Sequence, residues 1–571
     1  MKKIASLALA LGVVGISSVA AAADPVPNID PGTLQKIADD YRTNGAGSQM
    51  SRALEYMEKE RVAQQIEEDR AKLKNKIEAP EHKTDKPEVE AQRIKLQKLV
   101  FDPSTVLTKA ELDAIAANYV GKDVTVKDLY AVVEKVNDLY AKKGYVTCRA
   151  FLLRQTITDG SVKITLVEGK TGAVTIKGNK YTKKKYIINR IQLPEGEIAN
   201  INVLNKDMLR FNATNDMQLR IVMKAGSKPG TTDYELQAYE PQQYSTSVFV
   251  DNAGSYSSGQ VREGMFYSIK SLTGVRDNFT IGAVRSKGTK AVSTSYSRPI
   301  GRSGTKLNVQ YSTNSVRVVK GETADLGVKA HANSVGIGIV QPLVVNDKTR
   351  SELSFDLSRQ NSKTDFLTNS PFRLQYLNDT TKEMALGFAM TNYGKSHLFY
   401  QKHSLIYGRG EADNLSGYEN DNYVLYKGTG YYQKAYQHGQ AISVRAEAQW
   451  SANDGIPSAR DFYIGGMYSV RGYKENYLGS ESGFLISAEF SNPLNDKRTV
   501  NAFAFFDYAK LYGEVMSTRD ERILSSIGFG VKANLSKNIY SAVTVGFPLR
   551  RNMEIDKPSR ARAHFTLNGM F

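Results

Sequence analysis

Between Gln243 and Phe571 the chain repeats one pattern, in which short runs of alternating apolar and polar side chains are separated by polar loops. Alternation with a period of two places apolar side chains on one face of a β-strand and polar ones on the other. Clear examples are Met265 to Ile269, Lys306 to Tyr311, Val335 to Val340, Glu352 to Leu357, Ile442 to Trp450 and Phe484 to Phe490. At roughly 20 residues per strand and connection, and about 9–11 residues per membrane-spanning strand, residues 243–571 hold about 16 strands. We therefore predict a transmembrane antiparallel β-barrel.

The composition excludes a helical membrane protein. After the N-terminus the chain has no apolar run of about 18 residues, which a transmembrane helix would need. The 32 Tyr, the single Trp and the short alternating segments are typical of an outer-membrane barrel, whose strands barely register in hydropathy because every second residue is polar. A soluble β-rich protein is the alternative.

Residues 1–23 have the three parts of a secretory signal peptide. Lys2 and Lys3 form the basic region, Ile4 to Val19 the apolar region, and Ala21 to Ala23 a small-residue cleavage site. We therefore expect the mature chain to leave the cytoplasm.

The net charge of +17 is spread along the chain, without a basic cluster interleaved with aromatic residues, so nothing predicts nucleic-acid binding. The charge permits an acidic partner or anionic lipid headgroups. Cys148 is the only cysteine, which excludes an internal disulfide. Because Cys148 lies in a strand-like run, we predict a buried structural thiol.

Residues 24–91 contain no strand pattern. A short helix is predicted from Pro31 to Tyr41, with Asp30 as its N-cap, and a highly charged helix from Ser51 to Ile77. The Pro- and charge-rich segment from Glu78 to Glu90 has the composition of a linker. These residues form either a solvated helix with a spacer or a detachable element that occupies another part of the protein.

Residues 92–171 and 172–242 share the order strand, helix, helix, strand, strand, which makes an internal repeat. In the first module, strands are predicted at 94–101, 146–154 and 162–167, and helices follow Thr108 and Thr125. In the second, strands are predicted at 173–176, 218–224 and 234–239, and helices at 182–190 and 203–211. Both modules resemble POTRA domains, and the junction runs from Val167-Glu168-Gly169 to Gly178-Asn179.

A glycine-rich stretch, Gly465 to Gly483, interrupts the strand pattern of the barrel. It contains Gly465, Gly466, Val470, Arg471, Gly472 and Tyr473. Glycine allows the backbone to fold back tightly, and an arginine held inside a protein-lined cavity needs an anionic partner. The best candidate is Asp507, which shares an alternating strand with Phe503 and Phe505, so we expect this face to point inward. A solvated surface loop with an incidental arginine is the alternative.

Four Pro-containing pairs each end a strand before a polar segment, and we interpret all four as periplasmic turns, because proline fits where no ladder donor is needed. They are Pro299-Ile300, Pro342-Leu343, Pro493-Leu494 and Pro548-Leu549. The chain ends on an alternating strand, Phe565 to Phe571, with a terminal aromatic residue. Final strands of bacterial outer-membrane barrels look like this, and the barrel assembly machinery reads them.

Signal peptide, helix and linker, two POTRA-like modules and a barrel with Val470-Arg471-Gly472-Tyr473 in a late loop, at about 452–483, together resemble the TpsB transporters of two-partner secretion. This family belongs to the superfamily of POTRA-bearing barrels that includes BamA and is often named for haemolysin secretion and activation. The first barrel strand also fits, with Asp251, Asn252 and Gly254 followed by Gly259 and Arg262.

The resemblance implies that the loop folds into the lumen and that Arg471 pairs with Asp507 on the barrel wall. Ala509 departs from the family, in which many members have glycine at this position. The helix from Pro31 to Tyr41 looks like the plug helix of the family.

By resemblance, the chain exports an unfolded TpsA-like exoprotein of the haemolysin or adhesin class, which docks on periplasmic POTRA domains and crosses the outer membrane. The expected partners are this exoprotein, outer-membrane lipid and the assembly machinery. A BamA-type insertase and a passive porin-like channel are the alternatives. The six His and the scattered carboxylates show no metal-ligand spacing and no nucleophile motif, so we expect no catalytic residue, no metal and no cofactor.

Overall fold

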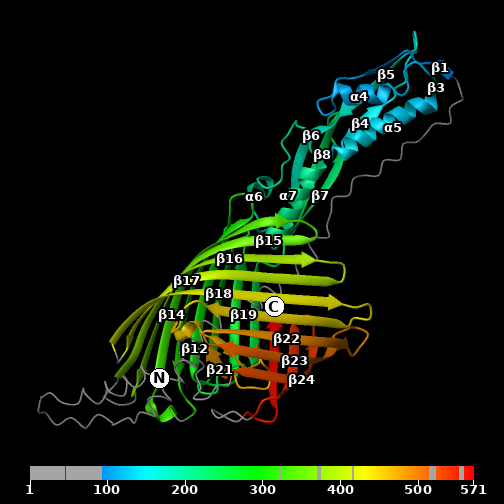
Figure 1. Ribbon diagram of the computed structural model, residues 1–571. Coiled ribbons are helices and arrows are strands. Elements are labelled where there is room, and N and C mark those ends of the chain that lie inside the picture. The colour runs from blue at the N-terminus through cyan, green and yellow to red at the C-terminus, as the bar shows by residue number, and fades with distance from the viewer. Residues whose placement is uncertain are drawn as a thin grey trace, which may run out of the picture. The chain divides into compact units, whose positions relative to one another are not determined.

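The computed structural model describes Ala46 and residues 93–321, 323–368, 374–414, 417–513, 522–551 and 558–571 (Figure 1). The chain forms two compact units, one built around residues 242–571 and the other around residues 69–241, and each is described by itself. The predicted signal peptide, the helices from Pro31 to Tyr41 and from Ser51 to Ile77, and the linker lie outside the described residues.

The first module is an α/β unit whose helices pack on a three-stranded sheet. Its elements are β1 (Arg93–Lys95), β2 (Lys98–Phe101), α4 (Lys109–Ala116), β3 (Asp123–Thr125), α5 (Val126–Lys142), β4 (Cys148–Phe151) and β5 (Ser161–Glu168). The strand order is β2-β5-β4, with β2 parallel and β4 antiparallel to β5. Cys148 is buried in this core, as predicted, and burial raises the pKa of its thiol to about 11.

Both helices of the first module begin at the residues that the sequence indicates. Thr108 and Thr125 cap α4 and α5, and each exchanges hydrogen bonds with an acidic residue three positions later. The apolar stripe of α5, which includes Val132 and Val136, is buried in the core of the module. Gly144 then adopts a positive φ of 87°, which ends the helix.

Two strand predictions in this module are wrong in their extent. The expected strand at 94–101 is split, because the backbone of Leu96 bonds to Lys122 and Gly121 instead of to a strand partner. The expected strand at 146–154 is only β4, since the side chain of Gln155 pairs with the backbone of Lys163 and takes the place of a ladder partner.

The second module repeats the order of the first. Its elements are β6 (Lys170–Lys177), α6 (Lys184–Ile188), α7 (Ile201–Thr214), β7 (Gln218–Ala225) and β8 (Thr231–Tyr239). The strand order β6-β8-β7, with one parallel and one antiparallel pair, matches that of the first module. The internal repeat is therefore a repeat of topology.

No helix among the residues that the structure describes is long and apolar enough to cross a membrane.

Sixteen antiparallel strands close into a barrel, as the alternation predicts (Figure 1). They are β9 (Tyr244–Asp251), β10 (Arg262–Lys270), β11 (Asn278–Arg285), β12 (Thr289–Ile300), β13 (Thr305–Arg317), β14 (Lys329–Val345), β15 (Thr349–Phe366), β16 (Leu374–Tyr393), β17 (His397–Asn414), β18 (Gly417–Ala435), β19 (Ala441–Ser451), β22 (Ser482–Pro493), β23 (Val500–Tyr512), β24 (Ile523–Asn534), β25 (Ile539–Pro548) and β26 (Arg562–Met570). The expected length of 9–11 residues is wrong for the five strands β14–β18, which have 17 to 20 residues.

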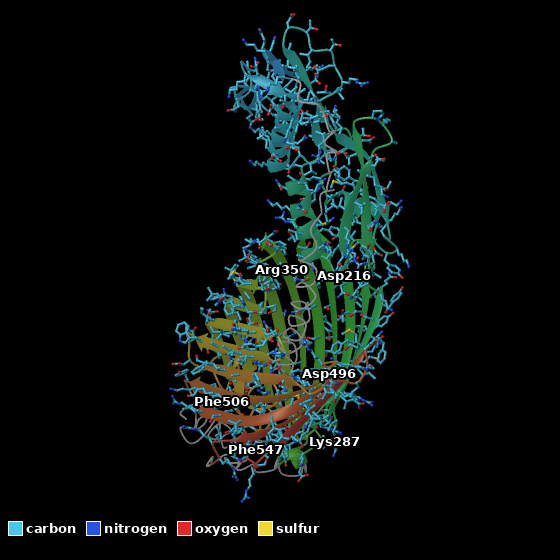
Figure 2. The ribbon with its side chains drawn as sticks, turned by 90° about the vertical axis from the view of Figure 1, so that its right-hand side faces the viewer. Asp216, Lys287, Arg350, Asp496, Phe506 and Phe547 are labelled. Carbon is cyan, nitrogen blue, oxygen red and sulfur yellow. The ribbon has the colours of Figure 1, made fainter. Side chains whose placement is uncertain are left out.

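Side chains alternate between the outside and the inside of the barrel along each strand. On β23, Phe506 is 45% exposed (labelled in Figure 2), whereas its neighbour Asp507 is fully buried. Phe503 and Phe505, on the same face as Asp507, are buried too. The face that the sequence places inward is thus the buried face.

The proline pairs do not all mark the same end of the barrel. Pro299 and Pro493 end strands at the side where β9 begins, as expected. Pro342 lies within β14, which continues to Val345 because a register shift after Pro342 accommodates the missing N–H. Pro548 ends β25 at the opposite side, since β25 runs antiparallel to β26, so its interpretation as a periplasmic turn is wrong.

Candidate functional site

The residues between β19 and β22, which we call the inner loop (452–481), fold back against the inside of the barrel wall. A short turn, η2 (Ser458–Arg460), leads into β20 (Phe462–Ile464), which pairs with β21 (Leu478–Ser480). The tip at 465–477 therefore closes a hairpin. The buried cluster of this tip consists of Ile464, Val470, Tyr473 and Leu478 from the loop and Leu485, Ala509, Leu511 and Leu524 from β22–β24.

Arg471 and Asp507 form the central contact between the tip and the wall. One Asp507 oxygen accepts from the Arg471 backbone N at 3.0 Å and from Nε at 2.8 Å, and the other accepts from Nη2 at 2.8 Å. The guanidinium also lies over the Phe505 ring, at 3.4 Å from its centroid. Bidentate, charge-assisted bonds between buried partners fix both position and orientation.

Two further residues of β22 hold the same guanidinium, and sequence reasoning missed both. The Ser487 hydroxyl lies 3.1 Å from Arg471 Nη2 and donates to Asp507 at 2.7 Å. A Glu489 oxygen lies 3.2 Å from Arg471 Nη1, and the other Glu489 oxygen pairs with Lys532. The only signal in the sequence is their alternation: Ser487 and Glu489 are polar residues on the inward face of a strand whose outward face is apolar.

Gly472 and Tyr473 attach the tip to the last strands of the barrel. The Gly472 N–H donates to His564 Nε2 on β26 at 3.2 Å. The Tyr473 hydroxyl donates to the carbonyl oxygens of Ser525 and Arg550, at 3.1 and 2.9 Å. Gly472 has a φ of 95°, and a Cβ there would lie 2.9 Å from the Gly546 backbone, so no other residue fits without displacement.

Gly465 and Gly466 shape the tip. Both have positive φ, at 100° and 108°. A Cβ on Gly466 would collide with the Glu475 carboxylate, which accepts from the Met467 N–H at 2.6 Å. These contacts stay within the tip and brace the turn that presents Val470 and Arg471.

The residues of the first-strand motif lie at a different place, where the barrel closes. Asp251 is buried and binds Arg262 of β10 through two bonds, at 2.9 and 2.7 Å. The Asn252 side chain donates to Ala563 O at 2.9 Å and accepts from Phe565 N at 3.0 Å, joining β9 to β26. Gly254 packs against the backbone of the following loop, where a Cβ would lie 2.1 Å from Gly259 O.

The contacts of the inner loop with the wall are hydrogen bonds, ion pairs and apolar packing. Within the described parts of the chain, no group of three His, Cys, Asp or Glu side chains is placed to hold a metal ion. The inner loop provides a buried ion pair between its tip and the barrel wall.

Comparison with known proteins agrees with this architecture. Residues 230–533, more than half of the chain, match the family model of the haemolysin secretion/activation protein ShlB/FhaC/HecB. Residues 94–169 match a POTRA domain of the ShlB type. The heme/hemopexin transporter protein HuxB of Haemophilus influenzae (strain 86-028NP) is 22% identical over 469 residues, 78% of this chain and 81% of HuxB. The outer membrane transporter CdiB of Escherichia coli O6:K15:H31 (strain 536 / UPEC) is 24% identical over 487 residues, 80% of this chain and 79% of CdiB.

Solved structures share the fold. CdiB from Escherichia coli superposes with a TM-score of 0.65 at 19% identity, covering 96% of this chain and all of that one. BamA from Haemophilus ducreyi lacking POTRA domains 1–3 superposes with a TM-score of 0.51 at 14% identity, covering 84% of this chain and all of that truncated chain. The family match, the POTRA module and the sixteen-stranded barrel lead to one conclusion: the chain belongs to the haemolysin secretion/activation family of outer-membrane transporters.

Proposed function

We propose that this transporter exports an unfolded exoprotein through its barrel, and that the inner loop gates the lumen through the Arg471–Asp507 pair. The barrel lies in the outer membrane and the POTRA modules in the periplasm. The gating role is supported by the position of the inner loop (452–481), which packs against the inner wall of a sixteen-stranded barrel. A barrel of sixteen strands otherwise encloses an aqueous channel. A loop held on the wall by buried ion pairs fills the lumen and can rearrange.

The two edges of the first POTRA sheet differ in what they offer to an extended peptide. On β4, the Cys148 N–H bonds to Tyr145 O and the Ala150 N–H to the Asn137 side chain, so this edge is already satisfied. On β2, the N–H groups of Leu99 and Phe101 point away from β5, because the flanking Lys98 and Asp102 bond to it. Strand addition needs an open edge, and within the described part of the chain no strand pairs with this side of β2, so we propose that the exoprotein docks along β2.

The N-terminal segment has a described contact on the lumenal side of the barrel. Ala46 is buried against Val316, Ala330 and Ala332, and its carbonyl accepts from Asn314 Nδ2 at 3.2 Å. These wall residues alternate with lipid-facing ones such as Val335. The contact supports the proposal that the predicted helix from Pro31 to Tyr41 supplies a plug, which would leave the lumen before transport.

The class of the exported protein is part of the proposal. The named relatives include a heme/hemopexin transporter and a transporter called CdiB, and we propose a large secreted exoprotein of the haemolysin or adhesin class for this chain. We propose that the barrel assembly machinery recognises the alternating strand β26 during insertion. We propose no catalytic activity.

Co-expression with large exoproteins encoded beside this chain tests the function, with surface exoprotein as the measurement. Deletion of residues 92–242 is expected to stop export while the barrel still inserts. Replacement of Phe101 by Pro removes one N–H of β2 that points away from β5 and is expected to weaken docking, whereas Phe101→Ala keeps this N–H and serves as the matched comparison. Export unaffected by the deletion would overturn the proposal in favour of an insertase or a passive channel.

A further inference from the structure

A second buried ion pair holds the first part of the inner loop (456–460), which we call its root, away from the Arg471 site. Arg460, in η2, binds Glu383 of β16 through Nε–Oε1 at 2.5 Å and Nη2–Oε2 at 2.7 Å. The two side chains are only 11% and 10% exposed. The Tyr423 hydroxyl of β18 donates to Glu383 Oε1 at 2.7 Å. The Gln360 Oε1 of β15 lies 3.5 Å from Arg460 Nη1.

The wall is shaped to receive this root. Gly408 faces the Tyr423 ring, and a Cβ there would lie 2.2 Å from the ring, so glycine leaves the space that Tyr423 occupies. A Cβ on Gly410 would likewise lie 2.6 Å from the Pro457 ring, so glycine leaves the space that this loop residue occupies. Ile456 of the loop is buried in an apolar cluster with Tyr423 and Leu425. The receptacle thus combines a fitted apolar surface with a bidentate charge pair.

Gln449 of β19 ties the two ends of the loop together at the same place. Its side-chain amide donates to Arg460 O at 2.6 Å and to Glu481 O at 2.9 Å. None of these contacts involves residues 465–477, so release of the tip does not by itself break them.

The two ion pairs act on different parts of the wall. Glu383 lies on β16 and Asp507 on β23, five strands apart in the order of the closed barrel. We propose that the Arg460–Glu383–Tyr423 cluster is a second, independent anchor that keeps the root of the inner loop on β16–β18 when the tip leaves Asp507. This proposal rests on the gating role of the loop. Arg460 and Glu383 are positioning residues: they determine that the loop stays bound to β16–β18 after its tip is released.

An independent anchor has a measurable consequence. With the root held, release of the tip opens only the part of the lumen next to β22–β26. With both anchors broken, the whole loop can leave the wall and the barrel conducts as a wide pore. The single and double variants should therefore differ in channel size and not only in the frequency of opening.

Single-channel recording of the full-length protein in planar lipid bilayers tests this without any exported substrate. We expect Glu383→Gln to raise the open probability about tenfold, since it removes the carboxylate that accepts two hydrogen bonds from Arg460. Asp507→Asn should give openings of intermediate conductance, and the double variant openings of larger conductance. Glu411→Gln, which breaks an outward-facing pair with Lys382 on the neighbouring strand, is the matched control and should behave as wild type.

Charge exchange provides the second arm. Arg460→Glu combined with Glu383→Arg should restore the closed channel, at least in part, because the pair is re-formed within the receptacle. The proposal is overturned if inserted Glu383→Gln gives wild-type recordings and if its addition to Asp507→Asn leaves the conductance of that variant unchanged. If Glu383→Gln does not insert, Arg460→Gln carries the test, since it changes the loop and leaves the wall intact. A failed export assay with these channel effects present refutes the proposed transport and leaves the anchor standing.

Discussion

Replacement of Asp507 by asparagine tests how strongly the tip of the inner loop is held. Asparagine keeps the volume but removes the charge, and its amide presents a donor to the donors of Arg471. Asp507 accepts three hydrogen bonds from Arg471 and one from Ser487, and its side chain is fully buried. Breaking such a buried pair costs about 3–5 kcal/mol. Glu489 remains 3.2 Å from Arg471 and offsets part of this cost.

We take the lower bound, about 3 kcal/mol, which lowers the ratio of docked to released tip roughly 100-fold, since each 1.4 kcal/mol is tenfold. We expect export of the exoprotein by Asp507→Asn to fall strongly, as for Arg471→Ala, because a tip that is already released before the substrate arrives no longer gates the lumen, while the barrel still inserts. Surface exoprotein is measured together with the heat-modifiable gel mobility of the folded barrel. Exchange of the two charges should not rescue export, because an acidic residue at position 471 would face Glu489.

An exposed ion pair on the same barrel provides the control. Arg285 Nε lies 2.6 Å from Glu263 Oε1, but the two side chains are 72% and 53% exposed. Exposed pairs contribute little, so Glu263→Gln should export normally. Wild-type export by a stably inserted Asp507→Asn or Arg471→Ala variant would refute the reasoning.

Three further predictions follow from other described contacts. Gly472→Ala should release the tip as Arg471→Ala does, because its Cβ meets the Gly546 backbone at a positive φ; the channel recordings check this, and unchanged recordings would contradict it. Cys148 should resist thiol reagents at pH 8 in the folded protein and react only in denaturant, since burial raises its pKa to about 11; rapid labelling without denaturant would contradict its placement. Burial raises the pKa of Glu168, but hydrogen bonds from Ser104, Thr105 and Tyr140 outweigh this effect and lower the pKa overall. The ionised Glu168 therefore stabilises the fold above its unfolded pKa of about 4.3, and this stabilisation is lost as the pH falls through the folded pKa. In urea, Cys148 of the full-length protein should therefore become reactive at lower denaturant concentration in acid, measured with a thiol probe that reacts at low pH, and Glu168→Gln should weaken this pH dependence.

Much of the fold could be predicted from local patterns. Alternation indicated sixteen strands because each strand has one lipid-facing and one lumenal side, and capping residues such as Thr108 and Thr125 located the helices. Proline was a weaker guide. It identifies a place without a ladder donor, which occurs at either end of a barrel, as at Pro548, and also at a register shift, as at Pro342.

The candidate site could be predicted only in part. Arg471 and Asp507 were paired through resemblance and through the alternation around Phe505. Glu489, His564 and Glu383 could not be found, because their contacts depend on the register of strands far apart in sequence and on the path of the loop. Nothing near Arg460 in the sequence indicates that its partner lies 77 residues earlier.

The unequal strand lengths have a consequence for how an exported chain leaves the protein. A strand of 20 residues, such as β16, extends roughly 65 Å, or about 45 Å along the membrane normal at the usual tilt, whereas the hydrocarbon layer is about 30 Å thick. The strands β14–β18 are neighbours, so the excess height is gathered in one sector, and β9–β11 have only 8 or 9 residues. The barrel therefore has a slanted rim. A polypeptide emerging from it is supported on one flank and free on the other, which favours an oblique exit and gives the nascent fold a wall to form against.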